Sequence, residues 1–178
     1  KLKKVLKKTE KLTKKNIYKA FEEDLAIPLQ FQDFKLEKQQ KSGDATKSKF
    51  LAYHFWLSTR DMARLGLLML NNGDWNGTQL ISEKWVKRIT SVVTPTDKMN
   101  PKSYRGLFEY GYMWWLWHDD NELFKGAYFA AGIYGQYLLI IPKLNMVISH
   151  KTKYGDKRNT SFTEFKELVY KIIESKNE

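Results

Sequence analysis

The sequence of 178 residues contains no cysteine and only four prolines. The absence of cysteine excludes disulfide bonds, thiolate metal sites and a cysteine nucleophile. No apolar run approaches the roughly 20 residues that a membrane-spanning helix requires, and no secretory signal peptide is visible. The sequence also begins without a methionine, so we expect the natural N-terminus to lie further upstream. The compartment stays open: cytoplasmic, periplasmic or secreted.

Acidic residues are scarce in the first 20 residues, which hold nine lysines and one glutamate and carry eight of the eleven net positive charges. Lysine outnumbers arginine along the chain, whereas arginine is the residue suited to bidentate recognition of bases and phosphates. The composition therefore does not favour a nucleic-acid-binding protein. Residues 1–20 also fit a basic amphipathic helix on an anionic membrane. Because Thr9 and Thr13 interrupt the apolar stripe, we favour a solvated helix face for this segment.

The N-terminal third is predicted to be helical and then irregular. Residues 1–25 carry apolar side chains at helical spacing, and Pro28 ends that pattern. Residues 35–49 are rich in Lys, Gln, Ser and Gly, which is typical of a surface loop.

Three later helices are each expected to begin after a serine N-cap, at Ser58, Ser82 and Ser161. In two of them a carboxylate follows three residues later, Asp61 in one case and Glu164 in the other. This spacing is that of a capping box, in which serine and carboxylate each accept a hydrogen bond from the other's backbone N–H.

From Tyr110 onward the hydrophobic period changes from that of a helix to that of strands. We expect four strands, over residues 111–117, 123–131, 136–141 and 144–150. Their short connections require antiparallel neighbours, and the last helix is expected to lie across one face of the sheet. The fold class is therefore α+β. A helical part with loops covers about residues 1–108, and the sheet with its closing helix covers 109–178.

The stretch from Ala127 to Pro142 reads as two apolar strands joined by a tight Gly-Ile-Tyr-Gly turn. Gly132 and Gly135 are expected to let the backbone turn where a side chain would obstruct it. A small-residue strand edge beside a glycine turn is a place where an acyl group can approach main-chain N–H groups. A plain hairpin in a sheet explains the same pattern, so the stretch alone does not decide between the two.

Two blocks of sequence carry a resemblance to a known family. The first is the run from Trp56 to Ser82, and the second comprises Tyr110 to Trp115, Ala131 to Gln136 and Ile141-Pro142. They resemble the C-terminal half of the serine β-lactamase-like hydrolases. This group includes class C β-lactamases, D-alanyl-D-alanine carboxypeptidases of the penicillin-binding protein type, esterases and 6-aminohexanoate-dimer hydrolases. The resemblance implies a partial β-lactamase/transpeptidase-like fold, with residues 1–178 as the C-terminal portion of one domain.

The chemistry of this family needs a Ser-x-x-Lys nucleophile, a Tyr-x-Asn or Tyr-x-Ser motif, and a Lys-Thr-Gly or His-x-Gly motif on the strand that lines the site. No serine of this chain has a lysine three positions later, and no tyrosine has Asn or Ser two positions later. The resemblance implies that both motifs lie upstream, in a missing N-terminal half of the same domain. Whether this chain alone is an enzyme stays open.

The third motif matches by position at Ala130-Ala131-Gly132. The resemblance implies that the next backbone N–H, that of Ile133, donates to the oxyanion. A main-chain donor does not depend on the side chain, so this role survives the departure from the motif. Because Ala130 replaces the cationic Lys or His, we expect a neutral small-molecule ester, amide or peptide substrate and not one with a carboxylate to be bound.

Other residues are candidates for contact with a substrate: Ala131, Tyr134, Gln136, Trp114 and His54. For Trp114 a place in the core is an equally good interpretation, and a lone histidine such as His54 is more often structural. Gln136 is polar on an apolar strand and needs a hydrogen-bond partner, so it can also brace the turn.

Two functions follow from these observations. The first is a fragment of a serine hydrolase that acts on ester, amide or β-lactam bonds through an acyl-enzyme. The alternative is a non-catalytic binding module or pseudoenzyme of the same fold. The histidines show no spacing of metal ligands, and the resemblance implies no cofactor.

Overall fold

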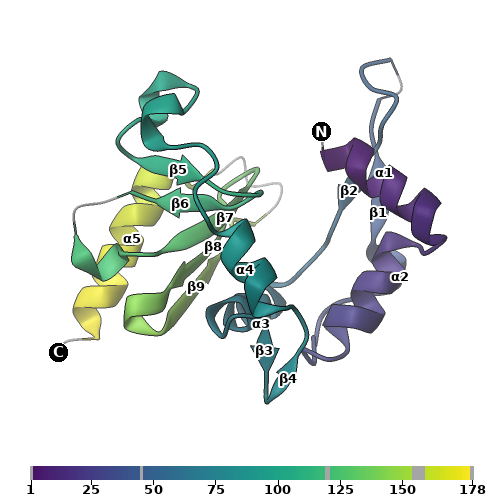
Figure 1. Ribbon diagram of the computed structural model, residues 1–178, viewed down its shortest axis with the longest axis horizontal. Coiled ribbons are helices and arrows are strands. Elements are labelled where there is room, and N and C mark those ends of the chain that lie inside the picture. The colour runs from purple at the N-terminus through teal and green to yellow at the C-terminus, as the bar shows by residue number, and fades with distance from the viewer. Residues whose placement is uncertain (1, 45, 119–120, 154–158, 177–178) are drawn as a thin grey trace. The chain divides into compact units, whose positions relative to one another are not determined.

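The computed structural model in Figure 1 describes residues 2–44, 46–118, 121–153 and 159–176. Its contacts divide the chain into two compact units, residues 1–61 and 62–178. Each unit is described by itself below. The expectation that the whole chain belongs to one domain stays a prediction.

The first unit combines short helices with a two-stranded hairpin. Its elements are α1 (Leu2–Thr13), α2 (Ile17–Phe21), the π-turn η1 (Glu22–Ala26), the 3₁₀ turn η2 (Leu36–Lys38), β1 (Gln40–Ser42) and β2 (Ala52–His54). The single helix expected over residues 1–25 is wrong, because Lys14 has a φ of 56° and breaks it. The Asn16 side chain then caps α2 by accepting hydrogen bonds from the N–H groups of Tyr18 and Lys19.

Polar contacts hold α1 on this hairpin. The Glu10 carboxylate accepts a hydrogen bond from Tyr53 OH at 2.7 Å and pairs with Lys41 Nζ at 2.5 Å. Lys41 and Tyr53 are register partners on β1 and β2. Burial opposes ionisation of Glu10, but the hydrogen bonds from Lys41 and Tyr53 outweigh it and lower the pKa of the carboxyl below its usual value.

The second unit contains a five-stranded antiparallel sheet in which neighbours in sequence are neighbours in space. Its strands are β5 (Phe108–Tyr110), β6 (Trp115–Trp117), β7 (Tyr128–Gly132), β8 (Gln136–Ile141) and β9 (Met146–His150). The strand expected over residues 111–117 is wrong in its first half, because residues 111–114 form a turn with Met113 at a φ of 69°. The strand expected from residue 123 begins only at Tyr128, after a 3₁₀ turn (Glu122–Phe124).

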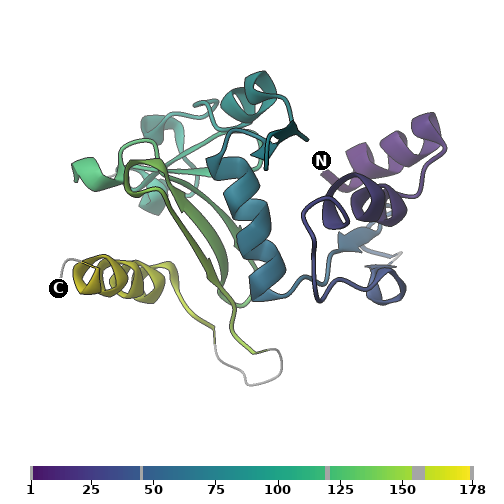
Figure 2. The ribbon, with the colours of Figure 1, turned by 90° about the horizontal axis from the view of Figure 1, so that it is seen from below.

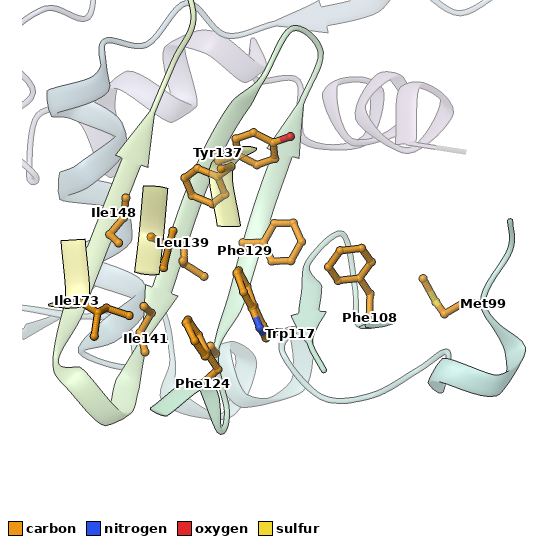
Figure 3. Close-up of a cluster of buried hydrophobic side chains, with 13 residues drawn as sticks. Met99, Phe108, Trp117, Phe124, Phe129, Tyr137, Leu139, Ile141, Ile148 and Ile173 are labelled. Atoms are coloured by element: carbon orange, nitrogen blue, oxygen red, sulfur yellow. The ribbon is translucent and has the colours of Figure 1, made fainter. Parts of the chain in front are cut away.

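Helices cover both faces of this sheet, as Figure 2 shows. The closing helix α5 (Phe162–Ser175) lies on one face, as expected, and buries Phe165, Val169 and Ile173. Figure 3 shows the sheet side chains of this layer, among them Phe129, Leu139 and Ile141. The layer is almost entirely apolar and aromatic, so burial of apolar surface is its main stabilising term.

The opposite face of the sheet packs against α3 (Thr59–Leu70) and α4 (Glu83–Ile89). Leu116, Tyr128, Leu138 and Ile140 point to this side and alternate with the side chains that face α5. Gly66 lies where α3 approaches β9 most closely, because a Cβ there would be 2.4 Å from Val147 Cγ1. The second unit thus has three layers, helix, sheet and helix, which confirms a mixed α and antiparallel β class.

Candidate functional site

The hairpin of β7 and β8 ends in a three-residue turn. Gly132 pairs with Gln136, which leaves residues 133–135 to reverse the chain. The positive φ angles fall at Tyr134 (65°) and Gly135 (74°), so the expectation that Gly132 turns the chain is wrong. Gly132 instead ends β7, where a Cβ would lie 3.1 Å from Gln136 Oε1. A larger residue at position 132 would crowd the Gln136 side chain.

Ile133 stands at the start of this turn with 72% of its side chain exposed. Within the part of the chain that the structure describes, its backbone N–H donates no hydrogen bond. Ala131 beside it is also exposed, and 55% of the Tyr134 side chain is accessible. A main-chain donor on an accessible, small-residue strand end can bind a carbonyl or oxyanion oxygen that approaches it.

The other side of the turn is fixed to the body of the unit. The Gly135 carbonyl accepts a hydrogen bond from His150 Nδ1 on β9 at 2.9 Å. Thr160, just before α5, packs so closely that a Cβ on Gly135 would lie 2.6 Å from its backbone N. Tyr137 OH donates to the Thr160 carbonyl at 3.0 Å. Sequence reasoning missed this corner, since its only local sign is a histidine at the end of an apolar strand.

Trp114 lies on the α3 side of the sheet. Its ring contacts that of Tyr128 edge-on, with centroids 5.3 Å apart, and it packs, partly buried, against the core cluster that faces α3 and α4. The Tyr128 hydroxyl donates to the Met69 carbonyl at 3.0 Å, and burial raises the pKa of this tyrosine. Trp114 is thus partly buried against the core, and its contact with a substrate stays a prediction.

His54 belongs to the first unit, at the end of β2. Its Nε2 lies 2.6 Å from Ser42 Oγ on β1, and both side chains are exposed. This contact gives His54 a partner within its own hairpin. Its predicted contact with a substrate stays a prediction.

Asp61 was predicted to complete a capping box with Ser58, but its buried carboxylate has other partners. It is fully buried, and its two oxygens accept hydrogen bonds from the N–H groups of Gln32 and Asp33, at 2.9 and 3.0 Å. The Arg60 guanidinium contacts the Asp33 carboxylate through two nitrogens. Asp61 lies one turn before Leu65 on the buried face of α3. This position in the sequence could have indicated that the carboxylate is buried and needs hydrogen-bond partners.

Among the residues that the structure describes, no group of His, Asp and Glu side chains is arranged to hold a metal ion. In the same residues no helix is both long enough and apolar enough to cross a membrane.

The three-layer unit and the sequence blocks around it are similar to two 6-aminohexanoate-dimer hydrolases, and this supports the resemblance to the β-lactamase-like serine hydrolase superfamily. The chain is 29% identical over 102 residues to the 6-aminohexanoate-dimer hydrolase of Paenarthrobacter ureafaciens. It is also 29% identical to the solved structure of a putative 6-aminohexanoate-dimer hydrolase from Bacillus anthracis, with a TM-score of 0.53. A comparison with protein-family models found no match.

Both similarities are partial in extent. The first covers 56% of this chain and 25% of the Paenarthrobacter protein, and the second covers 74% of this chain and 32% of the Bacillus structure. The chain therefore spans about a quarter to a third of these relatives. They support a hydrolase of this superfamily, and the activity of the whole protein is a matter for proposal.

Proposed function

We propose that this chain is the C-terminal portion of a serine hydrolase that cleaves ester or amide bonds through an acyl-enzyme. The observation that carries the proposal is the Ile133 N–H, which has no acceptor among the described residues and lies directly after the strand that matches the third motif. The nucleophile would be a Ser-x-x-Lys serine in the upstream part of the protein. The lysine would take the proton of the serine hydroxyl.

In this reaction the serine oxygen attacks the substrate carbonyl, and negative charge develops on the carbonyl oxygen. Ile133 N–H donates to that oxygen and stabilises the tetrahedral intermediate. The intermediate then collapses with release of an alcohol or amine, and water hydrolyses the acyl-enzyme. Gly132 keeps the strand end open, and the side chains of Ala131, Tyr134 and Gln136 line the approach.

The substrate class follows from Ala130. Its side chain packs with the apolar cluster that faces α3 and α4, so no cation stands at the place where the family motif has Lys or His. A substrate carboxylate would find no partner there, which favours a neutral ester or amide. The two relatives are named for hydrolysis of a 6-aminohexanoate dimer, and this agrees with cleavage of an amide bond.

The sheet supports the proposal of a partial β-lactamase/transpeptidase-like fold. Within the described residues no strand pairs with the outer edge of β9 (Met146–His150), and this strand has no proline and no lysine. Such an edge is a template for another strand. The opposite edge at β5 is covered, because Tyr110 exchanges backbone hydrogen bonds with Thr94. We propose that upstream strands of the same protein complete the sheet at β9.

The test is to express this chain joined to its upstream coding sequence. We expect a fluorophosphonate probe to label the serine of a Ser-x-x-Lys motif there, and p-nitrophenyl esters or anilides to be hydrolysed. Replacement of that serine by alanine is the matched control and should abolish both signals. A folded, longer protein that contains the motif but cleaves no ester or amide and takes up no probe would rule the proposal out.

The alternative is a non-catalytic binding module or pseudoenzyme, which the absence of Ser-x-x-Lys from these 178 residues favours. In that case the upstream sequence should lack the motif. The 178-residue chain should then be monomeric and bind a peptide or glycan without labelling of any serine. An isolated chain that aggregates would contradict this alternative.

A further inference from the structure

The turn that presents Ile133 is held by a histidine that belongs to another strand. His150 Nδ1 and the Gly135 carbonyl oxygen are 2.9 Å apart. Because a carbonyl oxygen only accepts hydrogen bonds, Nδ1 must carry the proton. The tautomer of His150 is therefore fixed by the turn.

The turn needs such support because its backbone is strained. Tyr134 lies between Ile133 and Gly135 and has a φ of 65°, a conformation that costs a residue other than glycine about 1 kcal/mol or more. Strain of this kind persists only where the surroundings hold it. The hydrogen bond to Gly135 and the close approach of Thr160 are two contacts that support the turn.

The His150 ring is itself fixed by the core. Its centroid is 5.9 Å from that of Phe165 on α5 and 6.2 Å from that of Tyr137, its register partner on β8. Phe165 is fully buried. His150 thus contacts α5, β8 and the carbonyl of Gly135, which lies two residues from the Ile133 N–H.

We propose that His150 is a positioning residue for the oxyanion donor. By holding the Gly135 carbonyl it fixes the orientation of the turn and so of the Ile133 N–H. This inference rests on the proposed function, since the oxyanion is that of the hydrolase reaction. His150 transfers no proton in this role, because its Nδ1 proton stays in the hydrogen bond throughout.

The first experiment uses NMR of the longer protein that carries the upstream sequence, because upstream strands are proposed to complete the sheet at β9. At neutral pH the ¹⁵N shifts of His150 should show the proton on Nδ1. In His150→Leu the backbone order parameters of Ile133 and Tyr134 should fall from about 0.85 to below about 0.6. His150→Asn should keep the turn rigid, because its amide nitrogen can donate from nearly the position of Nδ1.

Ser82→Ala is the matched control, because it removes the N-cap of α4 elsewhere in the same unit. It should leave the order parameters of the turn unchanged. A proton on Nε2 alone, or a turn as rigid in His150→Leu as in the unaltered chain, would overturn the proposal.

The second experiment uses the longer protein that carries the upstream motif. In His150→Leu we expect kcat to fall about tenfold or more with little change in KM, because misplacement of a catalytic donor slows the chemical step. His150→Asn should recover most of kcat, and Ser82→Ala should not lower it. An equal loss in His150→Leu and Ser82→Ala would show a merely structural role. If the longer protein has no activity, the proposed function fails, and the NMR experiment still decides whether His150 holds the turn.

Discussion

Two helices of this protein begin with the same signal and use it differently. At α5 the Ser161 side chain accepts from Glu164 N–H, and the Glu164 carboxylate accepts from Ser161 N–H at 2.7 Å, which closes a capping box. At α3 the Ser58 hydroxyl accepts from Asp61 N–H at 3.0 Å, but the Asp61 carboxylate accepts from Gln32 and Asp33 instead. The capping box at α5 is local and exposed. At α3 the carboxylate instead binds the backbone of a distant loop, a contact that we call the Asp61 clamp.

The difference shows that burial decides which N–H groups a carboxylate at this position binds. Glu164 lies at the surface, where water competes for its oxygens, so its contribution is that of a local cap. Asp61 lies on the buried face of its helix, where an unsatisfied charge would be costly. Its oxygens therefore take the two N–H groups of a loop that lies 28 residues earlier in the chain. A single motif thus serves either a helix end or the packing of a distant loop.

The largest effect is expected for Asp61→Ala. The change removes the acceptor of two hydrogen bonds to a carboxylate, from the N–H groups of Gln32 and Asp33, so we expect a loss of about 3 kcal/mol in the free energy of unfolding. Urea denaturation measures this loss, and amide hydrogen exchange at the two residues locates it. Asp61→Asn, which keeps the shape, should lose less. A loss below about 1 kcal/mol would show that the clamp is dispensable.

A smaller effect is expected for Ser161→Ala. Loss of the N-cap hydroxyl at α5 should cost about 1 kcal/mol, measured by thermal or urea unfolding, with faster exchange at the Glu164 amide. Ser161→Thr keeps the acceptor and is the control. Equal stability of the Ala and Thr variants would mean that the box contributes nothing.

Double-mutant cycles can compare the coupling between serine and carboxylate at α3 with that at α5. Ser58→Ala should cost about 1 kcal/mol or less, because the hydroxyl satisfies one N–H. Combined with Asp61→Asn, its effect should be nearly additive, since the Asp61 carboxylate is directed to the other loop. The Ser161 and Glu164 pair should be clearly non-additive. The reverse pattern of coupling would contradict the assignment of the two carboxylates.

The smallest effect is on the pH dependence of α5. The Ser161 hydrogen bonds lower the pKa of Glu164 below its ordinary value of 4.5. A carboxyl whose pKa is lowered in the folded state contributes stability above its unfolded pKa, and that contribution is lost as the pH falls through the folded pKa. Ser161→Ala should therefore raise the pKa of Glu164, which an NMR titration of its carboxyl carbon measures. An unchanged titration would contradict this coupling.

Much of the fold was predictable because its signals are local. The helix starts at Ser58, Ser82 and Ser161 were correct within a residue, and the β7–β8 hairpin and the face buried by α5 followed from periodicity. The turn at residues 111–114 was not predicted, because its aromatic residues have high strand propensity and tertiary packing overrode it. The break at Lys14 had no local sign either, since lysine rarely adopts a positive φ.

The candidate site was predictable only in part. Its position came from Gly132 and Ile133, where short sequence patterns and the family resemblance agree. The roles of His150 and Asp61 depend on partners 15 and 28 or more residues away, and periodicity carries no information about such pairs. The positive φ of Tyr134 was missed because the nearby Gly132 and Gly135 were expected to turn the backbone.

Gly66 has a consequence for the way in which β9 meets other chains. Because Gly66 has no side chain, the side chains of Val147 and Leu138 pack directly against the backbone of α3. This close packing supports the strand from the α3 side, while no strand among the described residues pairs with its outer edge. An edge held in this way requires little ordering when another strand adds to it, which favours correct completion of the sheet and equally favours self-association when the proper strand is absent.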